Sequence, residues 1–396
     1  MRSGWCGPDR MRERSVVHVT TVPKSLMFFT GQGQFLRSNG WQLVAVSSPG
    51  ADLAVFSSAE GVPTVEVPMS RSISPWADVR SLWRLMGVWH RLRPQVVHAH
   101  TPKGGLLGMI SARVMGVPVR IYHIHGLPFE TAHGLKRALL RSSEWVSCRL
   151  ATQVLAVSPS IAEVAERAKL ARRGSVRVLS SGSINGIDSL GRFNPDRESV
   201  ARSLVRAELG ICDAARVVGF SGRLVHDKGV DDLCEAWEHV KALCPSAHLI
   251  VMGEFESGDP VTKESKALLT GDSTMHLVGW VNEPERYYAA IDVLALPSHR
   301  EGFGLAAAEA LAMRVPVVAC EIAGLVDVVK DGVTGSLITP NSSEELAAAL
   351  VRYLEDADLC EQHGETGRMD MLDRFEPRSI WIEQLRLYEE LSTQTE

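Results

Sequence analysis

Short runs of apolar, β-branched residues alternate with helical patterns along nearly the whole chain, and this alternation constrains the fold more than any other feature. Apolar runs of this kind are typical of strands buried on both faces. In the first half we expect strands at 15–22, 42–47, 95–99, 117–123, 152–157 and 175–179, and helices at 26–37, 76–92, 106–115 and 134–148. Strand–helix–strand alternation predicts a parallel sheet covered by helices on both faces.

The second half repeats this pattern. Strands are expected at 216–221, 248–252, 275–278, 293–296 and 316–319, and helices at 231–243, 306–313 and 343–354. A chain of 396 residues exceeds what one hydrophobic core usually supports, and the Gly/Ser/Asn/Pro-rich stretch 181–195 would join two domains. The sequence therefore predicts an α/β protein with two doubly wound domains, 15–187 and 188–375, between a disordered arm (1–14) and a terminal segment (376–396).

Charge divides the chain unevenly. Residues 1–190 hold 23 Lys and Arg against 11 Asp and Glu, and the remainder holds 19 against 36. The basic half indicates an anionic partner, and charge alone leaves nucleic acid, a membrane surface and a phosphate-bearing acceptor open.

No apolar run is long enough to span a bilayer, and the basic arm lacks the apolar core of a signal peptide. The seven cysteines are scattered without metal-binding spacing, which favours a reducing compartment.

Arg223 and Lys228 project from one loop, GFSGRLVHDKG, which follows a predicted strand. A diphosphate needs two positive partners, one of them able to form a fork, and this pair supplies both. Alternatively, the two residues are solvated loop charges.

A second loop, PSHREGFGLAAAEAL, runs from Pro297 into a helix that opens near Leu305. The free N–H groups at the start of such a helix suit a phosphate. Glu309 follows Glu301 by eight residues, about 12 Å if the segment is helical, so the two carboxylates could hold a sugar and a ribose. Alternatively, they are a helix-start charge and a surface residue.

These two loops, together with PVVACEIAGLVDVVKDGVTGSLI, resemble the retaining family-4 glycosyltransferases, and the resemblance spans nearly the whole chain from Val16. It implies two Rossmann-like domains facing a cleft (the glycosyltransferase B architecture), with the terminal helix 381–391 returning to the first domain. It implies that Arg223 and Lys228 neutralise a donor diphosphate without a metal or other cofactor, and that UDP is the donor's nucleotide. The donor site it implies contains Gly222, Arg223, Lys228, Gly253, Glu254, Val278, Trp280, Glu301, Gly302, Phe303, Gly304, Leu305 and Glu309.

The first half, with VVHAHTPKGGLLGMISARVMGVPVRIYHIHGLPFE, resembles the branch that extends lipid-linked sugars in capsule, exopolysaccharide or glycan assembly. This implies a polyprenyl-diphosphate-linked acceptor rather than nucleic acid, and a catalytic set of His125, Arg223, Lys228 and Glu301. The stretch TPKGG could present Lys103 and free N–H groups to an acceptor phosphate. The acceptor residues are then Pro23, Gly31, Gln32, Thr101, Lys103 and Gly104, although the first loop lacks the adjacent glycines that many members carry.

Two histidine pairs imitate metal sites: His98 with His100, and His123 with His125, each two residues apart on one strand. No carboxylate is suitably spaced to complete either site, so no metal is expected.

The helical patterns 76–92 and 135–145 mix Trp and Leu with Arg and Lys. Such a pattern most often packs one face on a core, but it also suits a helix lying at a membrane interface. With the basic half-charge, it predicts a cytoplasmic protein held peripherally on the inner face of the plasma membrane.

Two other functions remain open: a nucleotide-sugar epimerase of the same fold and a non-catalytic scaffold. The intact Arg223, Lys228, Glu301 and Glu309 favour a hexosyltransferase over both. NAD-dependent oxidoreduction is disfavoured because no strand precedes G-x-G-x-x-G.

Overall fold

The computed structural model describes residues 14–70, 72 and 74–394 of the chain. They form two compact units, one made of the residues up to Gly186 together with those from Pro377 onward, and the other of Ile187–Glu376. The predicted arm lies outside the described residues except for Arg14, whose carbonyl accepts a hydrogen bond from the Gln42 N–H (3.0 Å).

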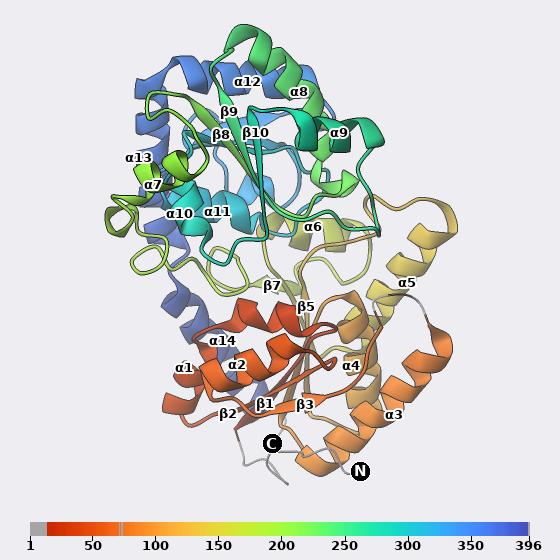
Figure 1. The fold of residues 1–396 in the computed structure, drawn as a ribbon. Helices are drawn as coiled ribbons and strands as arrows, with labels where there is room; N and C mark the ends of the chain where they lie inside the picture. Colours follow the sequence, from red (N-terminus) through yellow and green to blue (C-terminus); the bar gives the residue numbers. More distant parts are fainter. Residues whose placement is uncertain (1–13, 71, 73, 395–396) are drawn as a thin grey trace. The chain divides into compact units, whose positions relative to one another are not determined.

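Unit 1 contains, in its described residues, a seven-stranded parallel sheet in the order β3-β2-β1-β4-β5-β6-β7 (Figure 1). Its strands are β1 (Ser15–Val19), β2 (Gln42–Ser47), β3 (Thr64–Glu66), β4 (Val96–His100), β5 (Val119–Ile124), β6 (Gln153–Ala156) and β7 (Val176–Val178). Its α-helices are α1 (Gln32–Ser38), α2 (Ala51–Glu60), α3 (Pro75–Leu92), α4 (Pro102–Val114), α5 (Gly134–Leu150), α6 (Pro159–Arg167) and α14 (Pro377–Thr393).

Unit 2 contains, among the residues that are described, a six-stranded parallel sheet in the order β10-β9-β8-β11-β12-β13. Its strands are β8 (Val217–Ser221), β9 (His248–Met252), β10 (Met275–Gly279), β11 (Val293–Leu296), β12 (Val317–Cys320) and β13 (Gly335–Ile338). Its α-helices are α7 (Ala201–Glu208), α8 (Val230–Leu243), α9 (Lys263–Gly271), α10 (Pro284–Tyr288), α11 (Leu305–Ala312), α12 (Ser343–Glu355) and α13 (Ala357–Arg374). The prediction of two Rossmann-like α/β domains is confirmed.

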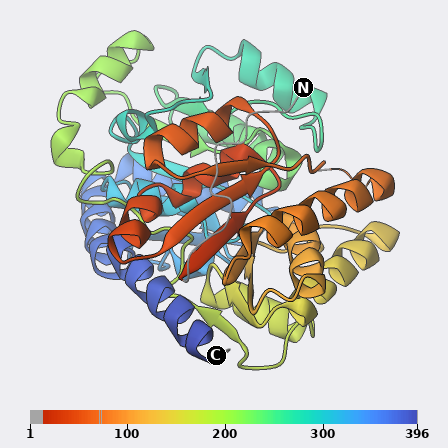
Figure 2. The same cartoon turned by 90° about the horizontal axis from the view of Figure 1, so that it is seen from below.

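Helix α14 completes the core of unit 1. Ile380, Leu387 and Tyr388 are buried in a cluster that also includes Trp41, which directly precedes β2, and Phe56 of α2. In Figure 2 this helix (dark blue) runs along the left of the view, whereas α3 and α5 (orange and yellow) lie on the right. Unit 1 is therefore built from two segments far apart in the sequence.

The predicted helix 26–37 is wrong as a single element. A 3-10 helix, η1 (Pro23–Phe29), is followed by the separate helix α1. The chain turns between them at Gly31, where φ is +87° and an added Cβ would lie 2.5 Å from the Trp381 ring. Because Gly31 has a left-handed backbone conformation, the right-handed helix cannot continue through it. The Trp381 ring also leaves no room for a side chain at this position.

Candidate functional site

The loops after β8 and β11 leave neighbouring strands at the same edge of the unit 2 sheet, because these two strands are paired in parallel. The loop after β8 includes a short 3-10 helix, η3 (His226–Lys228), and ends at Gly229. Gly229 has φ +65°, and a Cβ there would lie 1.9 Å from the Pro297 carbonyl oxygen of the second loop. Glycine is required at this contact, which holds the two loops together.

Lys228 and Glu301 form an ion pair between these two loops. Both side chains are mostly buried, with 18% and 16% of their surfaces exposed. The same Glu301 oxygen accepts a hydrogen bond from Ser298 Oγ (3.1 Å). Since an ammonium has three donors, Lys228 keeps donors for an anion besides the one used by Glu301.

Arg223 extends from the first loop and donates to Glu256 Oε2 at 2.9 Å. Nearly half of its side chain is exposed, 46%, and a guanidinium has five N–H donors, more than the bond to Glu256 uses. Arg223 and Lys228 thus come from one loop, as the sequence predicts. In this structure each forms an ion pair, with Glu256 and Glu301 respectively.

Gly222 and Gly253 bring the loops after β8 and β9 into contact. A Cβ on Gly253 would lie 1.8 Å from the Gly222 carbonyl oxygen, and the Gly253 N–H donates to the Gly279 carbonyl (2.8 Å) at the end of β10. Beside them, the Glu254 carbonyl accepts from the Leu224 N–H (2.9 Å). Val278 is half-buried on β10, and Trp280 is 53% exposed just after it.

Helix α11 begins directly behind the second loop. Gly304 is its N-cap residue with φ +85°, and the buried Phe303 packs edge-on against Phe375, with 5.1 Å between ring centroids. The Glu301–Glu309 spacing is not a helical rise, because α11 starts only at Leu305 and Glu301 lies in the loop before it. The prediction that about 12 Å of helix separates the two carboxylates is therefore wrong, because Glu301 is not part of the helix. Gly302 is approached by Gly324, where an added Cβ would lie 2.8 Å from the Gly302 carbonyl.

Glu309 faces a tyrosine within unit 2. Tyr288 Oη donates to Glu309 Oε2 at 3.0 Å. Burial raises the pKa of Glu309 to about 7, although the hydrogen bond from Tyr288 acts in the opposite direction. The neutral, protonated form of this carboxyl group is therefore favoured much more than in an ordinary glutamate.

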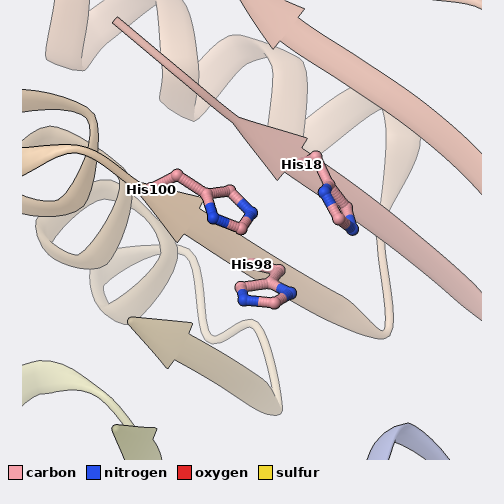
Figure 3. Close-up of side chains that lie close together, drawn as sticks. All are labelled: His18, His98 and His100. Atoms are coloured by element: carbon pink, nitrogen blue, oxygen red, sulfur yellow. The ribbon is translucent and has the colours of Figure 1, made fainter. Parts of the chain in front are cut away.

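Five histidines gather at the carboxyl ends of β1, β4 and β5 in unit 1. His18 of β1 is paired in register with His98 of β4, and His100 of β4 with His123 of β5. His125 follows β5, and its Nε2 lies 2.8 Å from His100 Nδ1. Figure 3 shows His98 and His100 on one face of β4, beside His18 from β1. Burial lowers the pKa of each of these imidazoles, to about 3 for His18 and His125, so the cluster is neutral.

The histidines include two triads, His18–His98–His100 and His100–His123–His125, each with one nitrogen per ring within 4.8 Å of the others. The hydrogen bonds argue against the first triad as a set of metal ligands. Tyr388 Oη contacts His98 Nδ1 (2.7 Å) and His18 Nε2 (3.1 Å), and Gln384 Nε2 donates to the same oxygen (2.9 Å). The hydroxyl has one proton, and the shorter contact, to His98 Nδ1, has the length typical of an O–H donor. With Tyr388 donating there, the His98 proton lies on Nε2 and His98 has no free lone pair for a metal.

The candidate acceptor residues are largely engaged within unit 1. Lys103 is bonded to both oxygens of Asp78, at 2.8 and 3.0 Å, and the Gly104 N–H donates to Thr21 Oγ1 (3.0 Å). Thr101 Oγ1 lies 2.7 Å from the same Thr21 hydroxyl. Neighbouring side chains therefore bind Lys103 and the Gly104 N–H in this structure, and their contact with an acceptor phosphate stays a prediction.

The first loop of unit 1 is held by α2 and α14. The Gly31 N–H donates to Glu60 Oε1 (2.9 Å). Gln32 is buried and bonds Asn185 Oδ1 (2.9 Å) through Nε2 and Gln384 (3.1 Å) through Oε1. Pro23 is buried at the start of η1.

The donor candidates therefore all belong to unit 2, and His125 and the acceptor candidates belong to unit 1. Sequence reasoning missed the partners Ser298, Glu256 and Tyr288, and it missed the contributions of His18 and Tyr388 to the histidine cluster. The histidines could have been grouped by aligning the ends of the predicted parallel strands, whereas Tyr388 belongs to a helix whose contacts no local pattern reveals.

Comparisons with known proteins match both units. A family model described as "Glycosyl transferases group 1" matches residues 202–370, and one described as "Glycosyl transferase 4-like domain" matches residues 29–182. The capsular polysaccharide biosynthesis glycosyltransferase CapM of Staphylococcus aureus is 30% identical over 378 residues, which cover 96% of this chain and 97% of CapM. The Escherichia coli UDP-Gal:alpha-D-GlcNAc-diphosphoundecaprenol alpha-1,3-galactosyltransferase is 28% identical, with 74% of each chain covered.

A solved structure shares the fold across both units. Anabaena HepE in complex with UDP-glucose has a TM-score of 0.77 and 22% identity, covering 96% of this chain and 99% of HepE.

Proposed function

Since this chain belongs to the group 1 glycosyltransferases, we propose that it is a retaining hexosyltransferase. It moves a hexose or N-acetylhexosamine from a UDP-sugar to a sugar carried on polyprenyl diphosphate, in the synthesis of a cell-surface polysaccharide or glycan. The observation that carries this proposal is the Lys228–Glu301 pair beside Arg223, at the ends of two adjacent parallel strands. Open α/β sheets bind ligands at such strand ends.

The donor diphosphate competes with carboxylates for the two cations. Lys228 and Arg223 hold Glu301 and Glu256, and a diphosphate offers more charge and more acceptor oxygens than either partner. The start of α11 adds backbone donors behind the loop. Once Lys228 turns to the diphosphate, Glu301 can accept hydroxyls of the transferred sugar, and Glu309 can accept those of the ribose.

The chemical step breaks the bond between the anomeric carbon and the diphosphate oxygen. The acceptor hydroxyl forms the new bond on the same face of the sugar, and its proton passes to the departing diphosphate. Arg223 and Lys228 stabilise the charge that develops on that leaving group. This requires no metal, because the two side chains supply the positive charge.

The acceptor is proposed from the relatives and from the charge of the first half. The Escherichia coli relative carries diphosphoundecaprenol in its name, and CapM is a capsular polysaccharide enzyme. Residues 1–190 hold twice as many basic as acidic residues, which suits an acceptor bearing a diphosphate.

Two helices of unit 1 support peripheral attachment to the cytoplasmic face of the plasma membrane. Trp76 and Trp83 of α3 are 89% and 70% exposed, and Leu135 of α5 is 87% exposed. Exposed basic residues accompany them on both helices: Arg80, Arg84, Lys136, Arg137 and Arg141. Exposed Trp and Leu among Arg and Lys suit the interface of an anionic bilayer. No helix within the described residues is long and apolar enough to cross a membrane.

Titration calorimetry with UDP- and GDP-sugars, followed by product analysis with polyprenyl-diphosphate-linked saccharides, tests the proposal. We expect binding of one UDP-sugar, and transfer with the anomeric configuration kept, as read by NMR of the product. An epimerised sugar formed without acceptor would replace the proposal with an isomerase, and absence of any nucleotide-sugar binding would replace it with a scaffold.

A further inference from the structure

His125 is held by a second histidine. Its Nε2 lies 2.8 Å from His100 Nδ1, and the two rings are nearly perpendicular, at 86° with centroids 5.0 Å apart. His100 is buried, whereas His125 is partly exposed. Among the described residues, the structure gives the His125 ring no other hydrogen bond, and its Nδ1 is not among the buried unpartnered atoms. His125 is therefore fixed through one nitrogen and presents the other outward.

The hydrogen bond between the two rings can form in two ways. Each ring is neutral and carries one proton. If His125 donates from Nε2, its outward Nδ1 is a lone pair, and the buried Nε2 of His100, which has no partner, carries an N–H. If His100 donates from Nδ1, its buried Nε2 is a lone pair, and the outward Nδ1 of His125 carries the N–H.

The neighbouring ring distinguishes the two patterns. His98 Nδ1 lies 2.7 Å from Tyr388 Oη, whereas His18 Nε2 lies 3.1 Å from it. The shorter contact has the length typical of an O–H donor; with Tyr388 donating there, the His98 proton lies on Nε2, which is also buried without a partner. The rings of His98 and His100 are 4.2 Å apart between centroids. A proton on His100 Nε2 would place two buried N–H donors without acceptors in adjoining rings, and each would have lost its hydrogen bonds to water without replacement. A lone pair on His100 Nε2 leaves His98 Nε2–H as the one buried donor without an acceptor in these two rings. It also places a negative partial charge near that donor.

The chemistry of His125 agrees with the second pattern. Burial lowers its pKa to about 3, which makes its lone pair a weak base for removing a hydroxyl proton. An imidazole N–H remains a good hydrogen-bond donor under the same conditions, and phosphate and hydroxyl oxygens are acceptors.

We propose that His100 is a positioning residue that donates from Nδ1 to Nε2 of His125, so that His125 presents an Nδ1–H to an oxygen of the bound substrate. His125 then acts as a hydrogen-bond donor and not as a general base. This inference rests on the proposed function for the role of His125, but the protonation pattern itself does not depend on activity.

The protonation pattern is measured directly by NMR of the full chain labelled with ¹⁵N-histidine, with the His125 signals assigned by their loss in His125→Gln. We expect the pyrrole-type signal at Nδ1 and the pyridine-type signal at Nε2. The reverse assignment overturns the proposal. Because this measurement needs no substrate, failure of the chain to transfer sugar would refute the proposed function and leave the protonation result standing.

A pair of variants tests the positioning role. His100→Asn keeps an N–H donor close to the place of Nδ1, whereas His100→Phe keeps a ring without one. With both substrates saturating, we expect His100→Phe to lower kcat about 10- to 100-fold with little change in KM, and His100→Asn to remain within a few-fold of the parent. His239→Ala, an exposed histidine of α8 in unit 2, is the control for histidine loss. Equal losses in both His100 variants at unchanged Tm would show that the donor is irrelevant and would overturn the proposal.

Discussion

At the scale of single residues, the candidate donor site contains two cations, Lys228 and Arg223, and each is paired with a carboxylate of unit 2. Lys228 is the residue on which the diphosphate assignment depends most, because it is the less exposed of the two cations, at 18% against 46%. Removing a preorganised charge next to a leaving group commonly costs 10²–10³ in turnover.

We therefore expect Lys228→Ala to lower kcat at least ~100-fold without unfolding the protein. Turnover at saturating donor, with circular dichroism as the check on folding, measures this. Lys241→Ala is the matched control, because Lys241 pairs with Asp272 elsewhere in unit 2. We expect this variant to keep the parental turnover. A Lys228→Ala enzyme with parental turnover would remove the diphosphate assignment.

Glu309 gives unit 2 a pH-dependent stability. Its pKa is raised in the fold to about 7 from an ordinary 4.5, so the folded state binds more protons than the unfolded state between these values. Stability contributed by this group is present below pH 4.5 and is lost as pH rises to 7.

Glu309→Gln should remove this loss. We expect its Tm to exceed the parental Tm by several degrees at pH 8 and to match it more closely at pH 5. Differential scanning calorimetry across this range measures the effect. A gain that is the same at both pH values would mean that ionisation of Glu309 is not the cause.

The histidine cluster shows what residue-level patterns can and cannot reveal. The pairs His98–His100 and His123–His125 are visible along single strands, but His18 joins them only through the register of β1 against β4. Arg223 and Lys228 were predictable because they share one short loop. The partners Glu256 and Ser298 were not, since a lone carboxylate or hydroxyl in a loop carries no signal until the loops are placed together.

At the scale of elements, the strands were predicted well, because buried parallel strands are continuous apolar runs. The missed strands, β3 and β13, are three and four residues long. The helices α2, α6, α7, α9, α10 and α13 were not predicted either. Helix α13 contains Gly364 and Gly367, which disfavour a helix in sequence. Its packing on α11 explains them: a Cβ on Gly367 would lie 2.6 Å from the Leu311 side chain, and one on Gly364 would lie 2.1 Å from the Arg314 carbonyl.

Helix α3 is the element on which membrane attachment depends. We expect the double change Trp76→Ala, Trp83→Ala to weaken binding to vesicles containing anionic lipid by about tenfold or more, because both indoles are exposed. Vesicle sedimentation of the full chain measures this. Met369→Ala on α13, 70% exposed in unit 2, is the control for loss of an exposed apolar side chain. Unchanged sedimentation of the double variant would contradict attachment through α3.

At the scale of the whole molecule, the two units depend on the C-terminal segment to different degrees. Truncation after Glu376 removes Ile380, Leu387, Tyr388 and Leu391 from the core of unit 1, at a cost of more than about 5 kcal/mol at the usual 1.5–3 kcal/mol per buried side chain. A domain's free energy of unfolding is only about 5–15 kcal/mol. We therefore expect unit 1 of the truncated chain to be unfolded or to melt at a much lower temperature.

The truncated chain should still bind nucleotide, because the donor candidates lie in unit 2. Calorimetric unfolding and nucleotide titration together measure both outcomes, with Glu390→Gln on the exposed face of α14 as the control. Loss of nucleotide binding along with unit 1 would show that the donor residues are not sufficient for binding.

The return of the chain to unit 1 also sets an order of events during synthesis. Residues 187–376 take about 10–40 s to translate at 5–20 residues per second, and unit 2 can close its sheet within that time. Unit 1, although it begins to emerge first, must wait for α14 with an apolar face uncovered. The first unit made is thus the last completed, and for those seconds a nascent chain offers chaperones a surface that the finished protein never shows.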